Sequence, residues 1–233
     1  MLENIPDHLP ILYLIMIVLF LIYFWNMLRK AYQARLATMV VLGLVIWCGV
    51  VNFLASTDFF LDFDTQPPRF LLVFPPMMLL IAFVAFRYTT SLKQLDIVPL
   101  TFIHIIRIPV ELFIHAWFIH ELVPQEMTYE GRNFDILSGI TALLVGFFLW
   151  RGGIKIHYRM VYAWNWLTLF LVINIVITAI LALPSPFQQI TPANIAVLHF
   201  PYITLPSLIV PIVIFCHVVS LIKLRDLKKE LDN

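Results

Sequence analysis

Seven long apolar stretches occupy most of the 233-residue chain and restrict its fold more than any other feature. A helix needs about 20 mostly apolar residues to cross a hydrocarbon core about 30 Å thick, because each residue rises about 1.5 Å. Hydrophobic residues make up 61% of the chain and charged residues 12%, which lies outside the range of soluble domains. The stretches lie near residues 9–28, 36–55, 69–86, 97–122, 136–150, 160–183 and 201–222. The sequence therefore predicts an all-α, polytopic bundle of seven transmembrane helices in a lipid bilayer, forming a single domain over residues 1–233.

The basic residues between the predicted helices are divided unevenly between the two sides of the bundle. When successive connections are assigned to alternate sides, Arg69 and Arg132 fall on one side and twelve of the fifteen basic residues fall on the other. The twelve are Arg29, Lys30, Arg35, Arg87, Lys93, Arg151, Lys155, Arg159, Lys223, Arg225, Lys228 and Lys229. Because cytoplasmic loops carry the excess of Lys and Arg, we expect an external N-terminus and a cytoplasmic C-terminus. A plasma or inner membrane location is expected.

The fourth predicted span contains four ionisable residues at helical spacing. His104, Arg107, Glu111 and His115 are separated by three, four and four residues, so they share one face of the helix. Arg107 lies roughly 15 Å from the cytoplasmic end, where an arginine facing lipid costs at least about 2.5–3.5 kcal/mol. We therefore expect this face to point into the bundle, with Glu111 as the ion-pair partner of Arg107.

Prolines interrupt the third, fourth and seventh predicted spans. Each proline lacks an N–H and leaves one backbone carbonyl without its helical hydrogen bond. Pro109 lies between Arg107 and Glu111 and predicts a bend at the charged centre of the fourth span. The other interruptions are Pro75, Pro76, Pro206 and Pro211.

Other spans supply polar residues that face the fourth span in the predicted bundle. His217 in the seventh span is roughly 9 Å from the cytoplasmic edge, level with His104, and Asn165 and Asn174 lie in the sixth. The predicted substrate or ion pathway comprises His104, Arg107, Glu111, His115, Asn165, Asn174 and His217. A structural alternative is that Arg107 and Glu111 join helices while the remaining residues hydrogen-bond the backbone.

The pathway residues favour a transporter, or a protein that translocates protons or ions. Ionisable residues inside a membrane mark substrate and ion pathways, and histidine exchanges protons near neutral pH. We expect a small polar solute, a proton or another ion as the transported species. Oligomeric state and partner subunits are not indicated by the sequence.

The alternative hypothesis is a membrane-embedded, metal- or haem-dependent enzyme acting on a lipid or another apolar substrate. Glu111 and His115 form an E-x-x-x-H pair that can hold a divalent metal, with Asp135, His199 or His217 completing the ligands. In the haem variant, His104 and His217 are the axial ligands. Asp135 has a simpler interpretation as the N-cap of the fifth helix after a solvated loop at 127–135.

Three classes of protein are not expected. A formal net charge of +1 without a basic arm argues against nucleic-acid binding. The chain contains no nucleotide-binding loop, so we expect no nucleotide cofactor. Seven spans with an external N-terminus match the topology of microbial rhodopsins, but a retinal Schiff base needs a lysine within the last span. Lys223 lies at the cytoplasmic end of that span.

Overall fold

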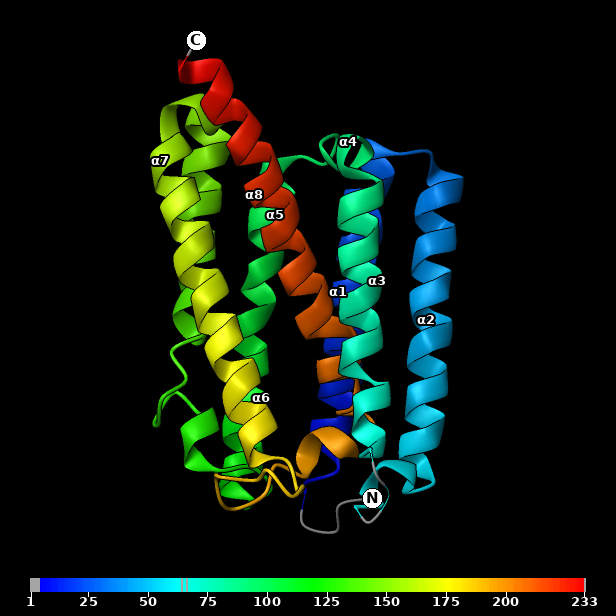
Figure 1. The fold of residues 1–233 in the computed structure, drawn as a ribbon. Helices are drawn as coiled ribbons and strands as arrows, with labels where there is room; N and C mark the ends of the chain where they lie inside the picture. Colours follow the sequence, from blue (N-terminus) through cyan, green and yellow to red (C-terminus); the bar gives the residue numbers. More distant parts are fainter. Residues whose placement is uncertain (1–4, 64, 66, 233) are drawn as a thin grey trace.

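The computed structural model describes residues 5–63, 65 and 67–232, and within these residues it is all-helical, without strands (Figure 1). The main helices are α1 (His8–Ala31), α2 (Ala34–Ser56), α3 (Phe74–Arg87), α5 (Ile97–Phe102), α6 (Arg107–Ile119), α7 (Ile136–Ala182) and α8 (Val210–Asp232). The short elements are η1 (Phe59–Leu61), η2 (Arg69–Leu72), α4 (Thr89–Leu92), η3 (Ile103–Ile106), η4 (Gln125–Met127), η5 (Ala196–Leu198) and η6 (Leu205–Ile209). The predicted all-α class is confirmed.

The outer surface of the bundle is apolar. Within the described residues, six helical stretches are long and apolar enough to cross a membrane, which indicates a membrane protein. Large side chains on this surface include Phe53, Leu79 and Phe170, each more than 60% exposed. Such a surface is compatible with a lipid bilayer, whereas water would penalise its exposure.

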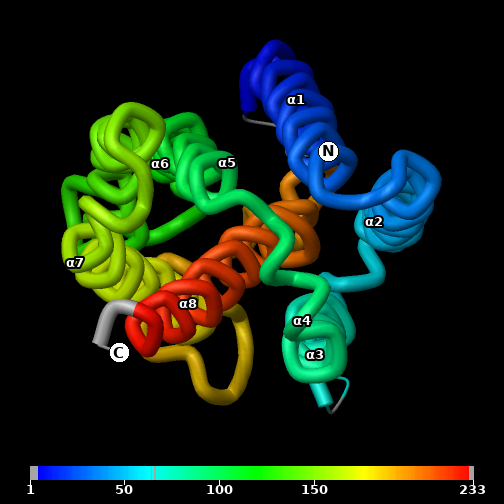
Figure 2. The backbone as a smooth tube through the Cα atoms, turned by 90° about the horizontal axis from the view of Figure 1, so that it is seen from above, coloured from blue at the N-terminus to red at the C-terminus, as the bar shows by residue number. Residues whose placement is uncertain are grey.

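α8 is the central helix, and the others surround it (Figure 2). In the most apolar 18-residue segment of the stretch that contains α8, 72% is buried inside the protein. The corresponding share is 17% for the stretch formed by α2 and 17% for the stretch that contains α3. Figure 2 shows α1, α2 and α3 on one side of α8, and α5, α6 and α7 on the other. The side chains that line the interior therefore come from helices far apart in the sequence.

α7 is a helical hairpin that reverses direction at Gly153. This residue has φ 73° and ψ 169°, a non-helical conformation that favours glycine. Trp164 Nε1 donates a hydrogen bond to Thr141 Oγ1 at 2.9 Å, although 23 residues of straight helix would separate these groups by about 35 Å. Residues 136–152 and 154–182 are thus two antiparallel arms. The turn lies within residues 151–159, between the fifth and sixth predicted spans, and helix extends into this connection from both sides.

The fourth predicted span contains a 3-10 segment, η3, between α5 and α6. η3 ends three residues before Pro109, so the irregularity lies in the turn whose hydrogen bonding that proline disturbs. Pro206 lies within η6, a π-helical segment at the start of the last span. Pro75 and Pro76 occupy the first turn of α3, where they begin that helix and do not interrupt it.

The first arm of α7 packs closely against the fourth span at two glycines. A Cβ atom on Gly139 would lie 2.7 Å from Ile108 Cγ1 and 3.3 Å from the carbonyl oxygen of His104. A Cβ atom on Gly146 would lie 2.5 Å from the Phe102 ring. Small residues allow two membrane helices to approach this closely. The contact fixes the arm beside the ionisable face of the fourth span.

Candidate functional site

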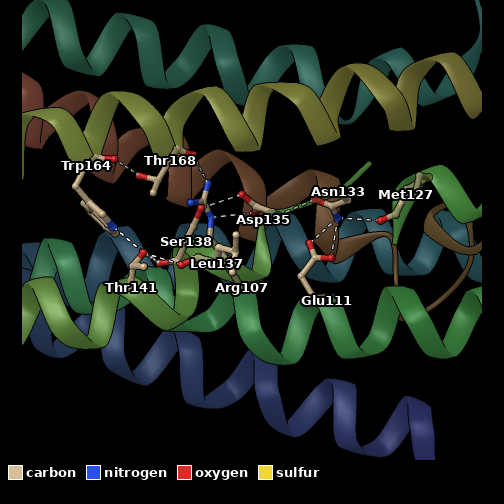
Figure 3. Close-up of polar contacts among 10 residues, drawn as sticks. All are labelled: Arg107, Glu111, Met127, Asn133, Asp135, Leu137, Ser138, Thr141, Trp164 and Thr168. Carbon is tan, nitrogen blue, oxygen red and sulfur yellow. Dashed lines mark hydrogen bonds and ion pairs between the residues drawn. The ribbon is translucent and has the colours of Figure 1, made fainter. Parts of the chain in front are cut away.

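Arg107 is buried at the start of α6, where its guanidinium contacts Asp135, which precedes α7, and Thr168 in the second arm of α7 (Figure 3). Its Nε lies 3.1 Å from Asp135 Oδ2, and Nη2 donates to the carbonyl oxygen of Thr168 at 3.0 Å. The predicted Arg107–Glu111 ion pair is wrong. Asp135, just before α7, pairs with the guanidinium instead. The Glu111 carboxylate lies one helical turn after Arg107 and binds Asn133.

The Glu111 carboxylate is 1% exposed and accepts hydrogen bonds from the side-chain amide of Asn133. Asn133 Nδ2 lies 2.7 Å from both carboxylate oxygens and 2.8 Å from the carbonyl oxygen of Met127. Its Oδ1 accepts from the backbone N–H of Asp135 at 3.1 Å. One neutral amide therefore holds Glu111 and connects it to the Arg107–Asp135 pair.

The segment that carries Asn133 and Asp135 enters the protein interior before α7 begins. Thr128, Asn133 and Asp135 are all 5% exposed or less. The interpretation of 127–135 as a solvated loop is therefore wrong for these residues. Asp135 precedes α7 at the N-cap position but forms no side-chain cap; it accepts from Ser138 Oγ at 3.3 Å and pairs with Arg107. Sequence reasoning missed Asn133, and its only signal was its place in the most polar connection.

His104 and His217 form a second buried cluster nearer the C-terminal end of the bundle. Their rings are stacked with centroids 4.0 Å apart, and both residues are fully buried. His217 Nδ1 is 3.0 Å from Asn165 Oδ1, and Asn165 Nδ2 donates to the carbonyl oxygen of Val161 at 2.9 Å. The amide oxygen thus faces the imidazole, which makes His217 Nδ1 the donor. Among the residues that the structure describes, His217 Nε2 and both nitrogens of His104 have no hydrogen-bond partner.

The proposed metal and haem ligands do not assemble into a site. Within the described part of the chain, no three His, Cys, Asp or Glu residues gather as a metal site, so the ligand set Glu111, His115, Asp135, His199 and His217 is not supported. Glu111 and Asp135 lie near one another but bind Asn133 and Arg107, while the three histidines have contacts elsewhere: His115 with Glu130, His199 with Ile195 and His217 with His104. Stacked rings 4.0 Å apart leave no space for a porphyrin between them, so the pair does not fit bis-histidine haem.

Most of the remaining predicted residues lie around the C-terminal part of α6 and the loop that follows it. His115 stacks on Tyr129 with ring centroids 4.7 Å apart, and its Nε2 lies 3.7 Å from Glu130 Oε1. Asn174 Nδ2 donates to the carbonyl oxygen of Arg132 at 3.2 Å. These contacts hold the segment 127–135 against α6 and the second arm of α7. His199 contacts the backbone carbonyl of Ile195 through Nδ1 at 2.9 Å.

An apolar cavity of about 160 Å³ adjoins the Arg107–Asp135–Glu111 group. Its walls come mainly from η2, α3, α6, the second arm of α7, η5, η6 and α8, and Met127 of η4 and Asp135 also line it. Arg107, Glu111 and Asp135 are its ionisable lining residues, and Asn194 adds one further polar side chain. Leu71 and Ile180, which also line it, are 42% and 47% exposed at the apolar surface of the bundle. The cavity therefore extends from the buried carboxylates towards the apolar outer surface of the bundle.

A family model described as a domain of unknown function, DUF8737, matches residues 68–225, about two thirds of the chain. The chain belongs to this family. Searches of curated proteins and of solved structures gave no match. The DUF8737 match contains the carboxylate group, the histidine pair and the whole lining of the cavity, whereas α1 and α2 precede it.

Proposed function

We propose that this chain crosses the membrane seven times, with an external N-terminus and a cytoplasmic C-terminus, in a plasma or inner membrane. The reversal at Gly153 supports this count, because the two arms of α7 add one crossing to the six apolar stretches. α1 begins at one end of the bundle and α8 finishes at the other in Figure 1, as an odd number of crossings requires. The excess of basic residues at the end where α8 finishes favours that end as cytoplasmic.

Within this topology, we propose a transporter that translocates a proton or another small cation through a site centred on Glu111. The observation that carries this proposal is a carboxylate with 1% exposure whose hydrogen-bond donor is a neutral amide. Arg107, the nearest cation along α6, is paired with Asp135 instead. A carboxylate in a medium of low dielectric must take up a proton or another cation to become neutral. Glu111 is thus suited to load and release positive charge.

The histidine pair extends the proposed pathway towards the cytoplasmic side. His104 is one helical turn before Arg107, and its two ring nitrogens have no hydrogen-bond partner. An imidazole nitrogen without a protein partner can accept or donate a proton, provided that another group or a water molecule reaches it. Asn165 fixes the ring orientation of His217. The path proposed here runs from the outer half at Glu111, past Arg107, to the stacked rings.

A flux measurement tests the proposed role of Glu111. The purified chain is reconstituted into liposomes that contain a pH-sensitive dye, and an imposed pH gradient drives proton movement. We expect Glu111→Gln to reduce flux to the rate of protein-free liposomes, because glutamine keeps the size and hydrogen bonding but cannot exchange a proton. The matched control is Glu121→Gln, an exposed carboxylate just after α6, which should leave flux unchanged. Wild-type flux in Glu111→Gln would exclude the proposed role.

A membrane-embedded enzyme acting on an apolar substrate is the second candidate. It is favoured by the same cavity, because two carboxylates beside an apolar space are suitable for general acid–base chemistry. Incubation of the protein with its native lipids, followed by mass spectrometry, distinguishes this function from transport. The enzyme would be favoured if wild-type protein converts a lipid over time and the Glu111→Gln variant does not.

A further inference from the structure

We propose that the cavity beside Glu111 binds a lipophilic amine, a small molecule with an apolar body and one protonated nitrogen. This inference rests on the proposed function, since it names the class of cation that the Glu111 site takes. Three properties of the cavity support it: the charge of its polar end, the nature of its walls, and the position of its mouth.

The polar end of the cavity has an excess of negative charge. When ionised, Arg107 and Asp135 neutralise each other across 3.1 Å, and Glu111 adds one further negative charge. The amide of Asn133 donates to both carboxylate oxygens but supplies no positive charge. A carboxylate accepts up to about four hydrogen bonds, so Glu111 retains acceptor capacity for a second donor. This end therefore selects a cationic donor over an anion.

The walls and size of the cavity select the rest of the ligand. Apart from the three ionisable residues and Asn194, the lining consists of apolar side chains and prolines. A volume of about 160 Å³ accommodates a group of roughly the size of a benzene ring, as engineered apolar cavities of similar volume do. An inorganic cation would leave this apolar volume unfilled and would lose its hydration shell without replacement ligands. An amine with a compact hydrocarbon body fits both parts of the cavity: its nitrogen binds at the polar end and its hydrocarbon body fills the apolar volume.

The mouth of the cavity favours entry from the bilayer. Leu71 on η2 and Ile180 on the second arm of α7 line the cavity and are also partly exposed on the apolar outer surface. A neutral amine dissolves in hydrocarbon and can reach the cavity between these elements. Its nitrogen lone pair then takes the proton of the neutral Glu111 carboxyl group, so that the O–H bond breaks and an N–H bond forms. The product is an ammonium–carboxylate pair, and no other reactant is needed.

Equilibrium binding to the purified full-length protein in lipid nanodiscs tests this inference, with benzylamine, benzyl alcohol and benzoate as probes of matched size. We expect wild-type protein to bind benzylamine more tightly than benzyl alcohol by about tenfold to a hundredfold, the range for a hydrogen bond between charged groups. Benzoate should bind most weakly. In Glu111→Gln, benzylamine should lose this advantage while the affinity for benzyl alcohol stays within about twofold, which shows that the cavity is intact.

A second variant tests the place of binding. Ala179 lines the cavity, and Ala179→Phe should fill it and abolish binding of both benzylamine and benzyl alcohol. Three results would each overturn the inference. The first is that wild-type protein binds benzylamine and benzyl alcohol equally well, and the second is that Glu111→Gln keeps the wild-type affinity for benzylamine. The third is that wild-type protein binds neither benzylamine nor benzyl alcohol. Proton flux that depends on Glu111 in a protein that does not bind benzylamine would leave the proposed function intact and remove the ligand class. Benzylamine binding without any proton flux would support the ligand class and remove the proposed transport function.

Discussion

The two buried polar clusters of this bundle meet their hydrogen-bonding needs in different ways. In the carboxylate group, Arg107 and Glu111 are held by Asp135 and Asn133 from the connecting segment and by Thr168 from the second arm of α7. Among the polar atoms of these side chains, only Arg107 Nη1 has neither a hydrogen bond nor an ion pair within the described residues. In the histidine pair, three of four ring nitrogens have no hydrogen-bond partner within the described part of the chain, and the rings contact each other and Trp164. Because leaving a buried polar group unsatisfied is costly, we infer that the first cluster stabilises the fold and the second contributes little to stability.

Arg107→Met should have the largest effect on stability. It leaves the Asp135 carboxylate buried without its cation, and breaking a buried ion pair in this way costs about 3–5 kcal/mol. The measurement is reversible unfolding of the purified protein in mixed detergent micelles. Arg132→Met is the matched control, since Arg132 is exposed in the same connecting segment and should change stability by less than about 0.5 kcal/mol.

The double variant Arg107→Met/Asp135→Leu separates the ion pair from the packing around it. Replacing both members of a buried pair by apolar residues is often close to neutral, so we expect the double variant to regain most of the lost stability. A double variant as unstable as Arg107→Met would show that the pair is not what stabilises this region.

Asn133→Ala should have the next largest effect. It removes the amide that donates to Glu111 and leaves that carboxylate without its protein donor, at an expected cost of about 2–3 kcal/mol. Asn174→Ala is a useful control, because Asn174 is less buried and makes one hydrogen bond to a backbone carbonyl, for which about 1 kcal/mol is expected. Equal losses in the two variants would contradict the importance assigned to Asn133. The same unfolding assay measures both.

His104→Phe should have the smallest effect on stability, a change of about 1 kcal/mol or less in either direction. Phenylalanine keeps an aromatic ring beside His217 and Trp164 and removes two nitrogens that have no partner. If the pair belongs to the proton pathway, the folded variant should nevertheless lose flux in liposomes. A loss of stability comparable to that of Arg107→Met would remove the contrast between the two clusters.

The sequence predicted the membrane-spanning character and the ionisable face of the fourth span because both depend on local patterns. Apolar length and helical spacing were enough to identify His104, Arg107 and Glu111 as one group, and depth along the helix was enough to match His104 with His217. The partners of Arg107 and Glu111 could not be predicted in this way. Asp135 and Asn133 reach α6 because the segment before α7 enters the interior, and this path depends on tertiary packing.

The reversal of α7 was also predicted only in part from the sequence. The adjacent glycines Gly152 and Gly153 were a visible signal for a turn, but the apolar stretches near 136–150 and 160–183 left a longer connection between them. Helical hydrogen bonding continues on both sides of Gly153 since a single residue with positive φ is sufficient to reverse the chain. The connection is therefore shorter than the gap between the two apolar stretches indicates.

This one-residue turn has a mechanical consequence for the guanidinium of Arg107. A single non-helical residue joins the two arms of the hairpin, so we expect them to tilt as one body. Asp135 adjoins the start of the first arm and Thr168 lies within the second, and Arg107 is clamped between them. A movement of the hairpin away from α6 would release both contacts at once and leave a free cation one turn from Glu111.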